Sequence, residues 1–427
     1  MNNGRAFVIV GGGLAGARAA GAIRAEGFTG RVVVVAAEEE FPYIRPPLSK
    51  EYLQGAAERD SVFVHPAEWY AEQEIEVLRG RQAARLSPAD HRLTLADGDV
   101  LGYDRLLLAT GAAPRRYPGE GAALPGVHHL RTLGDSEALR EALRPGSRRV
   151  VIVGAGWIGL EVASAARGYG NEVTVLGRES VPLNLVIGDE VGAVFGALHR
   201  ANGVDLRMST GVSGILGDET GVTGVRLDTG EVVPADVVVV GIGAVPNVAL
   251  AEEAGLEVDN GIVTDAAFRT SAADVYAVGD VASVFHPVLG HRIRIEHWAN
   301  AENAGTAAGT SMAGGPVSYD TIPYFYTDQF DLGMEYSGYG DLAGDATVVI
   351  RGDLAAREFV AFWVADSRVV AGMNVNVWDV NETVQELIRS RVRVDARRLA
   401  DERIALTDLT EQSGPAGLSA DAPDQGE

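Results

Sequence analysis

The sequence contains no cysteine and only one lysine among its 427 residues, and both shortages restrict its chemistry. Without cysteine the chain can form no disulfide bond, thiolate metal site or cysteine nucleophile. If this is a redox protein, its electrons must therefore pass through a bound cofactor and not through a pair of thiols. We predict no metal site.

Positive charge and long apolar runs are also scarce. The formal net charge is -23, which repels nucleic acid and anionic membrane surfaces. No apolar run approaches the roughly 20 residues needed to span a bilayer, and no signal peptide precedes the first predicted strand. We therefore expect a cytoplasmic protein, with neither nucleic acid nor membrane as a partner.

The length of the chain predicts two or three domains, each with a core of its own. A hydrophobic content of 46%, a charged content of 22% and 53 glycines are typical of an α/β protein with many tight turns. From about Glu411 the chain has no aromatic residue and turns acidic. We therefore predict a disordered tail, residues 409–427.

The single lysine, Lys50, ends the run Arg45-Pro46-Pro47-Leu48-Ser49-Lys50. Lysine carries a compact charge on a thin stem, which fits beside an aromatic cofactor where the wide guanidinium of arginine would not. The alternative is that one lysine simply escaped an arginine-favouring composition.

A glycine-rich loop, GGGLAG at residues 11–16, follows the first predicted strand (7–10) and precedes an alanine-rich helix. Its glycines Gly11, Gly13 and Gly16 suit, in that order, a tight turn, the close approach of a pyrophosphate, and close packing of the helix on the strand. This order of elements predicts a dinucleotide site, and the alternative is a glycine-rich turn without function.

The unit continues and then recurs. The next predicted strand, 31–35, is followed by Glu38, near the position of an acid that binds a ribose diol. A second strand and glycine loop follow at 150–159, and two such units imply two dinucleotides. Apolar strands at 104–108 and 236–240 indicate where the chain leaves and re-enters the first unit, so the second domain is inserted into the first.

Together these motifs resemble the FAD-dependent pyridine nucleotide-disulfide reductase superfamily. The resemblance covers about residues 6–405 and also includes Ala109-Thr110-Gly111, the stretch 270–280 and the cysteine-free run 45–50. Segments 295–301 and 323–330 are similar to the branch of ferredoxin and rubredoxin reductases that serve cytochromes P450 and ring-hydroxylating dioxygenases. The apoptosis-inducing flavoprotein belongs to that branch.

The resemblance implies a function and a domain plan. Electrons would pass from NADH or NADPH through FAD to a [2Fe-2S] or similar ferredoxin. The fold would be α/β, with two nested Rossmann-like dinucleotide-binding domains plus a small C-terminal α+β domain. The FAD domain would comprise 1–112 and 245–318, the NAD(P) domain 113–244, and the C-terminal reductase domain 319–408, with strands predicted at 346–351, 359–364 and 369–375 and a helix at 379–390.

The resemblance also assigns residues to the FAD site. They are Gly11, Gly13, Leu14, Ala15, Gly16, Glu38, Arg45, Lys50, Ala83, Thr110, Gly111, Arg131, Asp280, Glu296, His297, Trp298 and Tyr326. Arg45 offers a fork to a pyrophosphate, and Asp280 could accept a ribityl hydroxyl. Trp298 could instead be plain core, and Arg131 a surface side chain. Relatives commonly have tryptophan at the position of Tyr326, which keeps the aromatic plane and adds a hydroxyl.

For NAD(P)H the resemblance implies Gly154, Gly156, Trp157, Ile158, Gly159, Glu161, Arg178, Glu179 and Gly243. We expect Lys50 and Glu161 to be the catalytic pair, joined as an ion pair beside the flavin. Many relatives carry an acid at the position of Gly177. Because that acid is missing, Arg178 could clasp a 2'-phosphate, or Glu179 could replace the acid. We predict the use of NADPH, alone or alongside NADH.

The acceptor is the last expectation. Ferredoxins are usually acidic, so a reductase of this charge needs a local positive rim. Candidates are Arg115, Arg116, Arg292, Arg294 and the arginines near position 393, although the last group could be an ordinary solvated helix face. The alternatives to a ferredoxin reductase are an NAD(P)H oxidase and a nucleotide-sensing flavoprotein that acts through partner binding. We expect a monomer or weak homodimer.

Overall fold

The computed structural model describes residues 4–410 and divides the chain into two compact units, Met1–Asp331 and Leu332–Glu427. Most of the predicted tail, 409–427, lies outside the described residues. Its first two residues, Leu409 and Thr410, end the short helix α11 (Thr407–Thr410). Across the described residues, no helix has both the length and the apolar character needed to span a membrane.

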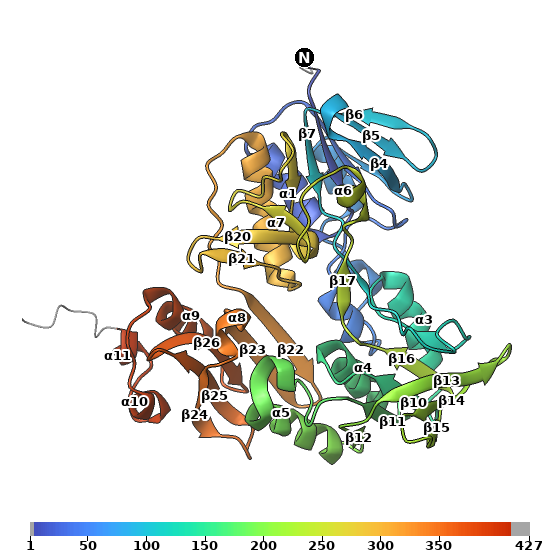
Figure 1. Ribbon diagram of the computed structural model, residues 1–427, viewed down its shortest axis with the longest axis vertical. Helices are drawn as coiled ribbons and strands as arrows, with labels where there is room; N and C mark the ends of the chain where they lie inside the picture. The colour runs from blue at the N-terminus through green and yellow to red at the C-terminus, as the bar shows by residue number, and fades with distance from the viewer. Residues whose placement is uncertain (1–3, 411–427) are drawn as a thin grey trace, which may run out of the picture. The chain divides into compact units, whose positions relative to one another are not determined.

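A five-stranded parallel sheet forms the core of the first of two Rossmann-like folds within Met1–Asp331 (Figure 1). Valine, isoleucine and leucine fill its central strands, which are buried on both faces, as is usual in parallel sheets. The strand order is β19 (Val275–Ala277), β7 (Arg105–Leu108), β1 (Ala6–Val10), β2 (Arg31–Val35) and β3 (Ile75–Leu78). One strand therefore comes from far along the chain, beside strands from its beginning.

Two helices pack closely together beside this sheet, α1 (Leu14–Ala25) and α7 (Trp298–Ala313) (Figure 1). Small residues allow the close approach. A Cβ atom at Gly305 would meet the backbone of Ala15, and one at Gly309 would meet the backbone of Ala19. The alanine-rich composition of α1 thus brings a late segment of the chain against the first glycine loop.

A second five-stranded parallel sheet repeats the pattern. Two short antiparallel strands, β8 (Ala112–Pro114) and β17 (Ala244–Pro246), carry the chain out to this sheet and back (Figure 1). The predicted α/β fold with two nested Rossmann-like units is confirmed. The strand order is β12 (Asp205–Arg207), β11 (Glu172–Leu176), β10 (Arg149–Val153), β16 (Val237–Val240) and β9 (Val127–His128), with helices α3 (Leu133–Leu143), α4 (Trp157–Gly168) and α5 (Asn184–Ala201).

Smaller elements complete the first unit. They are the sheets β4 (Ala83–Ser87), β5 (Arg92–Leu95), β6 (Val100–Gly102); β13 (Val212–Asp218), β14 (Gly221–Leu227), β15 (Val232–Pro234); and β18 (Ile262–Thr264), β20 (Ala282–His286), β21 (His291–Ile293); the helices α2 (Ala67–Glu72) and α6 (Ala249–Glu253); the short helices η1 (Pro46–Ser49), η2 (Arg59–Val62), η3 (Pro88–Asp90) and η4 (Gly279–Val281); and strand β22 (Tyr324–Gln329).

The second unit is built on an antiparallel sheet, in agreement with the predicted α+β domain. The three predicted strands and the predicted helix are all present, with ends that differ by at most two residues. The elements are β23 (Leu332–Gly338), β26 (Arg368–Val375), β25 (Glu358–Ala365) and β24 (Thr347–Asp353), in that order across the sheet, with α8 (Gly340–Ala343), α9 (Asn381–Ser390) and α10 (Ala396–Ala400).

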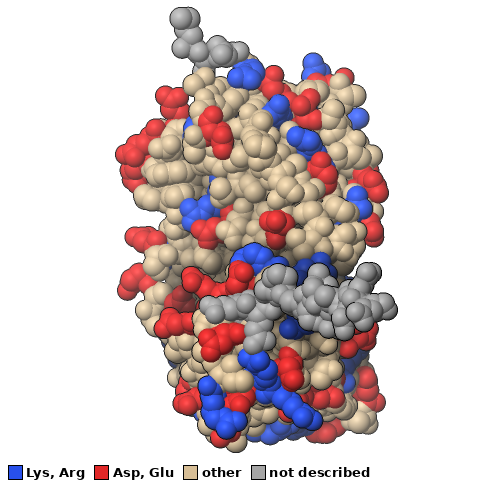
Figure 2. Space-filling view, turned by 90° about the vertical axis from the view of Figure 1, so that its left-hand side faces the viewer, with Lys and Arg blue, Asp and Glu red and all other residues tan. Residues whose placement is uncertain are grey.

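Charged side chains of both signs are interspersed on the face drawn in Figure 2, and neither sign covers it alone. Many charged side chains of the described residues are paired. Arg59, for example, reaches both Glu40 and Glu137, at 2.7 and 3.1 Å.

Candidate cofactor and active site

A cavity of about 1370 Å³ opens in the first unit, where strands β1, β2 and β7 end at their carboxyl edges. This edge is where open α/β sheets bind their ligands. Every residue predicted for the FAD site lines the cavity except Gly16. A Cβ atom at Gly16 would meet the carbonyl of Gly11, so this glycine lets α1 start close to β1. Its role is in packing beneath the cavity.

The two glycine loops have similar local geometry. Gly11 has φ +130°, a conformation that side chains rarely allow, and a Cβ there would meet the backbone of Ala109. A Cβ on Gly13 would meet nothing within 4 Å. The second loop repeats this, with φ +113° at Gly154 and open space at Gly156. Both loops therefore leave room for a group to approach the backbone.

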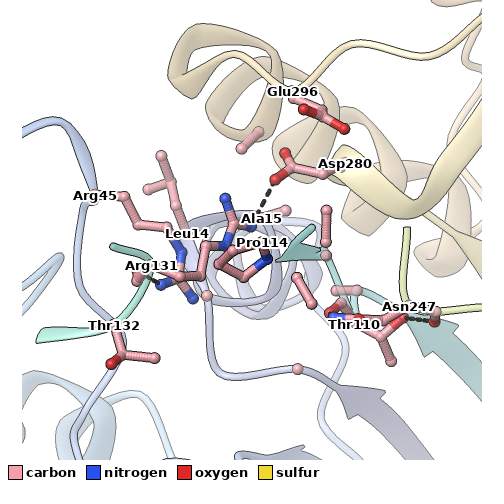
Figure 3. Close-up of a pocket in the computed structure, with 18 of the residues that line it drawn as sticks. Leu14, Ala15, Arg45, Thr110, Pro114, Arg131, Thr132, Asn247, Asp280 and Glu296 are labelled. Carbon is pink, nitrogen blue, oxygen red and sulfur yellow. Dashed lines mark hydrogen bonds and ion pairs between the residues drawn. The ribbon is translucent and has the colours of Figure 1, made fainter. Parts of the chain in front are cut away.

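A chain of charged groups crosses the cavity wall. Arg131 Nη2 lies 2.7 Å from Asp280 Oδ2 (Figure 3). Arg45 donates to the backbone carbonyl of Arg131 and lies 3.3 Å from a carboxylate oxygen of Glu38. Arg131 is thus part of the cavity wall and not a surface side chain.

Several polar atoms of the wall are buried and have no hydrogen-bond partner within residues 4–410. They are Nδ1 of His297, Nε1 of Trp298 and Nε of Arg131. Buried polar groups are normally hydrogen-bonded, so these atoms fit a ligand that is rich in oxygen and nitrogen, as FAD is. Burial lowers the pKa of His297 to about 4, which keeps its ring neutral near pH 7. Trp298 lines the cavity and is not plain core.

Lys50 and Glu161 form the ion pair that the sequence predicted. Nζ of Lys50 lies 2.9 Å from Oε1 of Glu161, and the side chains are only 7% and 3% exposed. The ammonium also lies 5.3 Å from the ring centre of Tyr326, over its face. Glu161 is positioned by the first turns of α4, and Lys50 by the proline-stiffened η1. A buried pair of this kind needs further hydrogen bonds to offset desolvation.

Those hydrogen bonds come from residues that the sequence analysis missed. The hydroxyl of Ser49 donates to Oε2 of Glu161, and that of Thr327 donates to Oε1 at 2.5 Å. Tyr43 was also missed; its hydroxyl donates to Glu38, and burial raises its pKa to about 12. All three lie in or near a motif already singled out: Ser49 precedes Lys50, Thr327 follows Tyr326, and Tyr43 lies two residues before Arg45. Proximity to those motifs was the available signal.

The residues predicted for NAD(P)H are divided between two places. Trp157, Ile158 and Glu161 line the cavity. The others do not line it and lie in the second glycine loop, after β11 or before β17: Gly154, Gly156, Gly159, Arg178, Glu179 and Gly243. A Cβ at Gly177 would come within 2.6 Å of the Met208 side-chain end and 3.0 Å of the Ala155 Cβ. The packing thus suits glycine at the end of β11, with exposed Arg178 beside it.

The arginines expected to attract an acceptor differ in whether their guanidinium groups already bond to other residues. Arg116 lines the cavity and is exposed. Arg294 instead bonds to Glu296, and its Nη1 lies 3.2 Å from the carbonyl of Asp280. Its charge is therefore already engaged by the cavity wall.

The fold and this cavity define an oxidoreductase built around two dinucleotide sites. Residues 5–305 match the family model described as pyridine nucleotide-disulphide oxidoreductase, and residues 324–410 match that described as reductase C-terminal. The chain therefore belongs to the pyridine nucleotide-disulphide oxidoreductase family, as a flavoprotein that uses FAD and NAD(P)H.

Similar proteins match this chain over nearly its whole length. The anthranilate 1,2-dioxygenase system ferredoxin--NAD(+) reductase component of Burkholderia cepacia is 39% identical, over 94% of this chain and 98% of that protein. Putidaredoxin reductase of Pseudomonas putida is 37% identical, over 96% and 97%. The crystal structure of the covalent putidaredoxin reductase-putidaredoxin complex matches with a TM-score of 0.91 and 35% identity, over 96% of this chain and 98% of that one.

Proposed function

We propose that the protein is an NAD(P)H-dependent ferredoxin reductase that supplies electrons to a cytochrome P450 or a dioxygenase system. The observation that carries the proposal is the buried Lys50–Glu161 pair, held in a cavity that begins at the first glycine loop. The chain has no cysteine, so no thiol pair stands beside this site. Relatives named as reductase components of dioxygenase and putidaredoxin systems support the same conclusion.

The cavity wall supplies the proposed FAD contacts. Gly13 leaves its backbone open to the pyrophosphate, and Arg45 and Arg131 bring positive charge to it. The unpartnered nitrogens of His297 and Trp298 would bond to the cofactor. When bound, FAD accepts two electrons with a hydride from NAD(P)H and releases them one at a time to an iron-sulfur acceptor.

The buried pair would act through charge and position. The ammonium of Lys50 stabilises negative charge that develops beside it, and the low exposure of the site makes this effect stronger than it is in water. Glu161 would orient the nicotinamide carboxamide. Hydride transfer needs no general base, so neither residue is assigned that role.

We propose that the nucleotide is NADPH, alone or alongside NADH. The support is Gly177 at the end of β11, which brings no carboxylate to a ribose diol, and the exposed guanidinium of Arg178 next to it. Substituting Arg178→Ala should lower kcat/KM for NADPH by about tenfold, because it removes one charge-assisted contact. The value for NADH should stay within about twofold. A wild-type enzyme that strongly prefers NADH would contradict this assignment.

The acceptor is proposed to be a [2Fe-2S] or similar ferredoxin that meets a positive rim. Arg115 and Arg116 are exposed beside the cavity, whereas Arg294 is held by Glu296. We also propose a cytoplasmic location, where NAD(P)H is regenerated.

The direct test mixes the FAD-loaded protein with NADPH or NADH and a bacterial [2Fe-2S] ferredoxin, without oxygen, and follows ferredoxin reduction. Reduction that is fast at low salt and slows as salt rises is the expected result. If the flavin is reduced and the ferredoxin stays oxidised, the acceptor class is wrong. If neither nucleotide reduces the flavin, the proposed function fails.

A further inference from the structure

A row of buried hydrogen bonds continues beyond Glu161, away from Lys50. Oε1 of Glu161 accepts from the hydroxyl of Thr327, at 2.5 Å. Nε2 of Gln329 donates to that hydroxyl oxygen at 3.2 Å, and Oε1 of Gln329 lies 2.9 Å from Nε2 of His199. Thr327, Gln329 and His199 are each at most 1% exposed. The row therefore joins the reactive pair to the end of helix α5 without touching solvent.

Every bond in this row points the same way. A carboxylate can only accept, so Thr327 must donate its single hydroxyl proton to Glu161. The oxygen of Thr327 then accepts from the amide NH₂ of Gln329, which leaves the amide oxygen to accept from His199. His199 is thus fixed as the tautomer protonated on Nε2, and Nδ1 is buried without a partner among the described residues. The donors line up toward the negative charge, an arrangement in which neighbouring bonds strengthen each other.

The row is poorly suited to carry protons. A proton passing along it would have to cross the amide of Gln329, which has no readily ionised form. It would also need a source at His199, which is fully buried and whose pKa is lowered by burial, with the Gln329 bond acting in the opposite direction. These features favour a fixed arrangement over a pathway.

We propose that Thr327, Gln329 and His199 are positioning residues, which hold Glu161 in place against Lys50 through this one-way row of hydrogen bonds. The inference rests on the proposed reduction of FAD by NAD(P)H at this site. None of the three touches the cavity. Substitution should have the largest effect on Glu161 at Thr327, which bonds to it directly, and the smallest at His199, which lies at the far end of the row.

Other titratable side chains lie near the same pair. Asp328 and Tyr326, which flank Thr327 on β22, and Glu51, which follows Lys50, surround it. Burial raises the pKa of Asp328, opposed by Lys50 and reinforced by Glu161 and Glu51. Burial raises the pKa of Tyr326 to about 12. Because the carboxyl group of Asp328 also takes up a proton in acid, the test is made at one constant pH.

The test uses Thr327→Val, which removes the hydroxyl and keeps the shape, with Thr327→Ser as the variant that restores the donor. Thr264→Val is the matched control. Thr264 is a buried strand residue, 1% exposed, and its hydroxyl has no partner among the described residues. Gln329→Met and His199→Phe interrupt the row further from Glu161. Two quantities are measured on the FAD-loaded protein: the rate of hydride transfer from the nucleotide, and the magnetic resonance signal of labelled lysine.

The lysine signal gives a readout independent of activity. Lys50 is the only lysine in the chain, so labelled lysine reports on this ion pair alone. Thr327→Val should move the signal and slow hydride transfer by about 10- to 100-fold, with KM nearly unchanged, because it removes one hydrogen bond to a charged group. Thr327→Ser should restore both, and Thr264→Val should change neither. Gln329→Met should have a smaller effect than Thr327→Val, and His199→Phe the smallest.

Three results would overturn the inference. One is a Thr327→Val protein with the wild-type signal and rate. Another is an equal loss of rate in all three positions, since only a proton pathway requires every member equally. If Thr327→Val does not fold, Gln329→Met decides, and an unmoved lysine signal in that variant counts against the inference. A wild-type protein that NAD(P)H does not reduce would refute the proposed function, while the lysine signal would still decide the positioning role.

Discussion

Removing one partner of the Lys50–Glu161 pair should cost far more stability than removing both. In Glu161→Gln the ammonium of Lys50, which is 7% exposed, is left without a negative partner. In Lys50→Met the carboxylate of Glu161, which is 3% exposed, is left without a positive partner. Breaking a buried pair in this way lowers the free energy of unfolding by about 3–5 kcal/mol. In the double variant neither side chain of the pair is charged, and glutamine can accept from one of the hydroxyls of Ser49 and Thr327 with its oxygen and donate to the other with its amide group.

The double variant should therefore lie within about 2 kcal/mol of the wild type, because replacing a buried ion pair with neutral side chains of similar volume is often nearly neutral. Single and double variants are compared by urea unfolding of the flavin-free protein, followed by circular dichroism. The two substitutions should then couple by at least about 4 kcal/mol, well above the range for independent sites. Single variants that each cost less than about 1 kcal/mol, or a double variant that costs their sum, would refute this account of the pair.

Three further predictions concern other parts of the site. Lys50→Arg keeps the charge but not the shape, so it should slow hydride transfer by about 100-fold; an unchanged rate in stopped-flow measurements would remove the argument for lysine at this position. Gly13→Ala should weaken FAD binding and leave the thermal midpoint of the flavin-free protein unchanged. Gly16→Ala should lower that midpoint, because its Cβ meets the carbonyl of Gly11. If both variants change FAD affinity and thermal midpoint equally, the two glycines do not have separate roles. The pKa of His297 is lowered to about 4 in the folded protein, so the unfolded chain takes up the proton first as the pH falls. The free energy of unfolding should therefore fall as the pH drops from about 6.5 to about 4. In a plot of the free energy of unfolding against pH, His297→Asn should flatten this part, and identical plots for the variant and the wild type would show that this ring does not contribute.

Local patterns predicted most of the fold. The strands before each glycine loop, and the strands of the second unit, appear where periodicity and composition placed them, because these signals depend on neighbours in the sequence. The nesting of the two parallel sheets was predicted from the apolar strands at 104–108 and 236–240, where the chain leaves the first sheet and returns to it. The resemblance supplied the pairing of Lys50 with Glu161, which lie 111 positions apart.

The rest of the site depends on contacts that no local pattern encodes. The hydroxyl of Thr327 reaches Glu161 only because β22 packs against α4, and His199 reaches Gln329 from a helix of the inserted domain. The engagement of Arg294 by Glu296 likewise appears only in three dimensions; from the sequence it was a candidate for acceptor docking. Such pairings arise when distant segments fold together, so a single sequence carries no separate signal for them.

The measurement that tests the central claim most directly is the rate at which the nucleotide-reduced flavin is reoxidised in air, with and without a bacterial [2Fe-2S] ferredoxin. A ferredoxin reductase should be reoxidised slowly in air alone and much faster when ferredoxin is added. Fast reoxidation in air that ferredoxin does not change would contradict the account and identify an NAD(P)H oxidase.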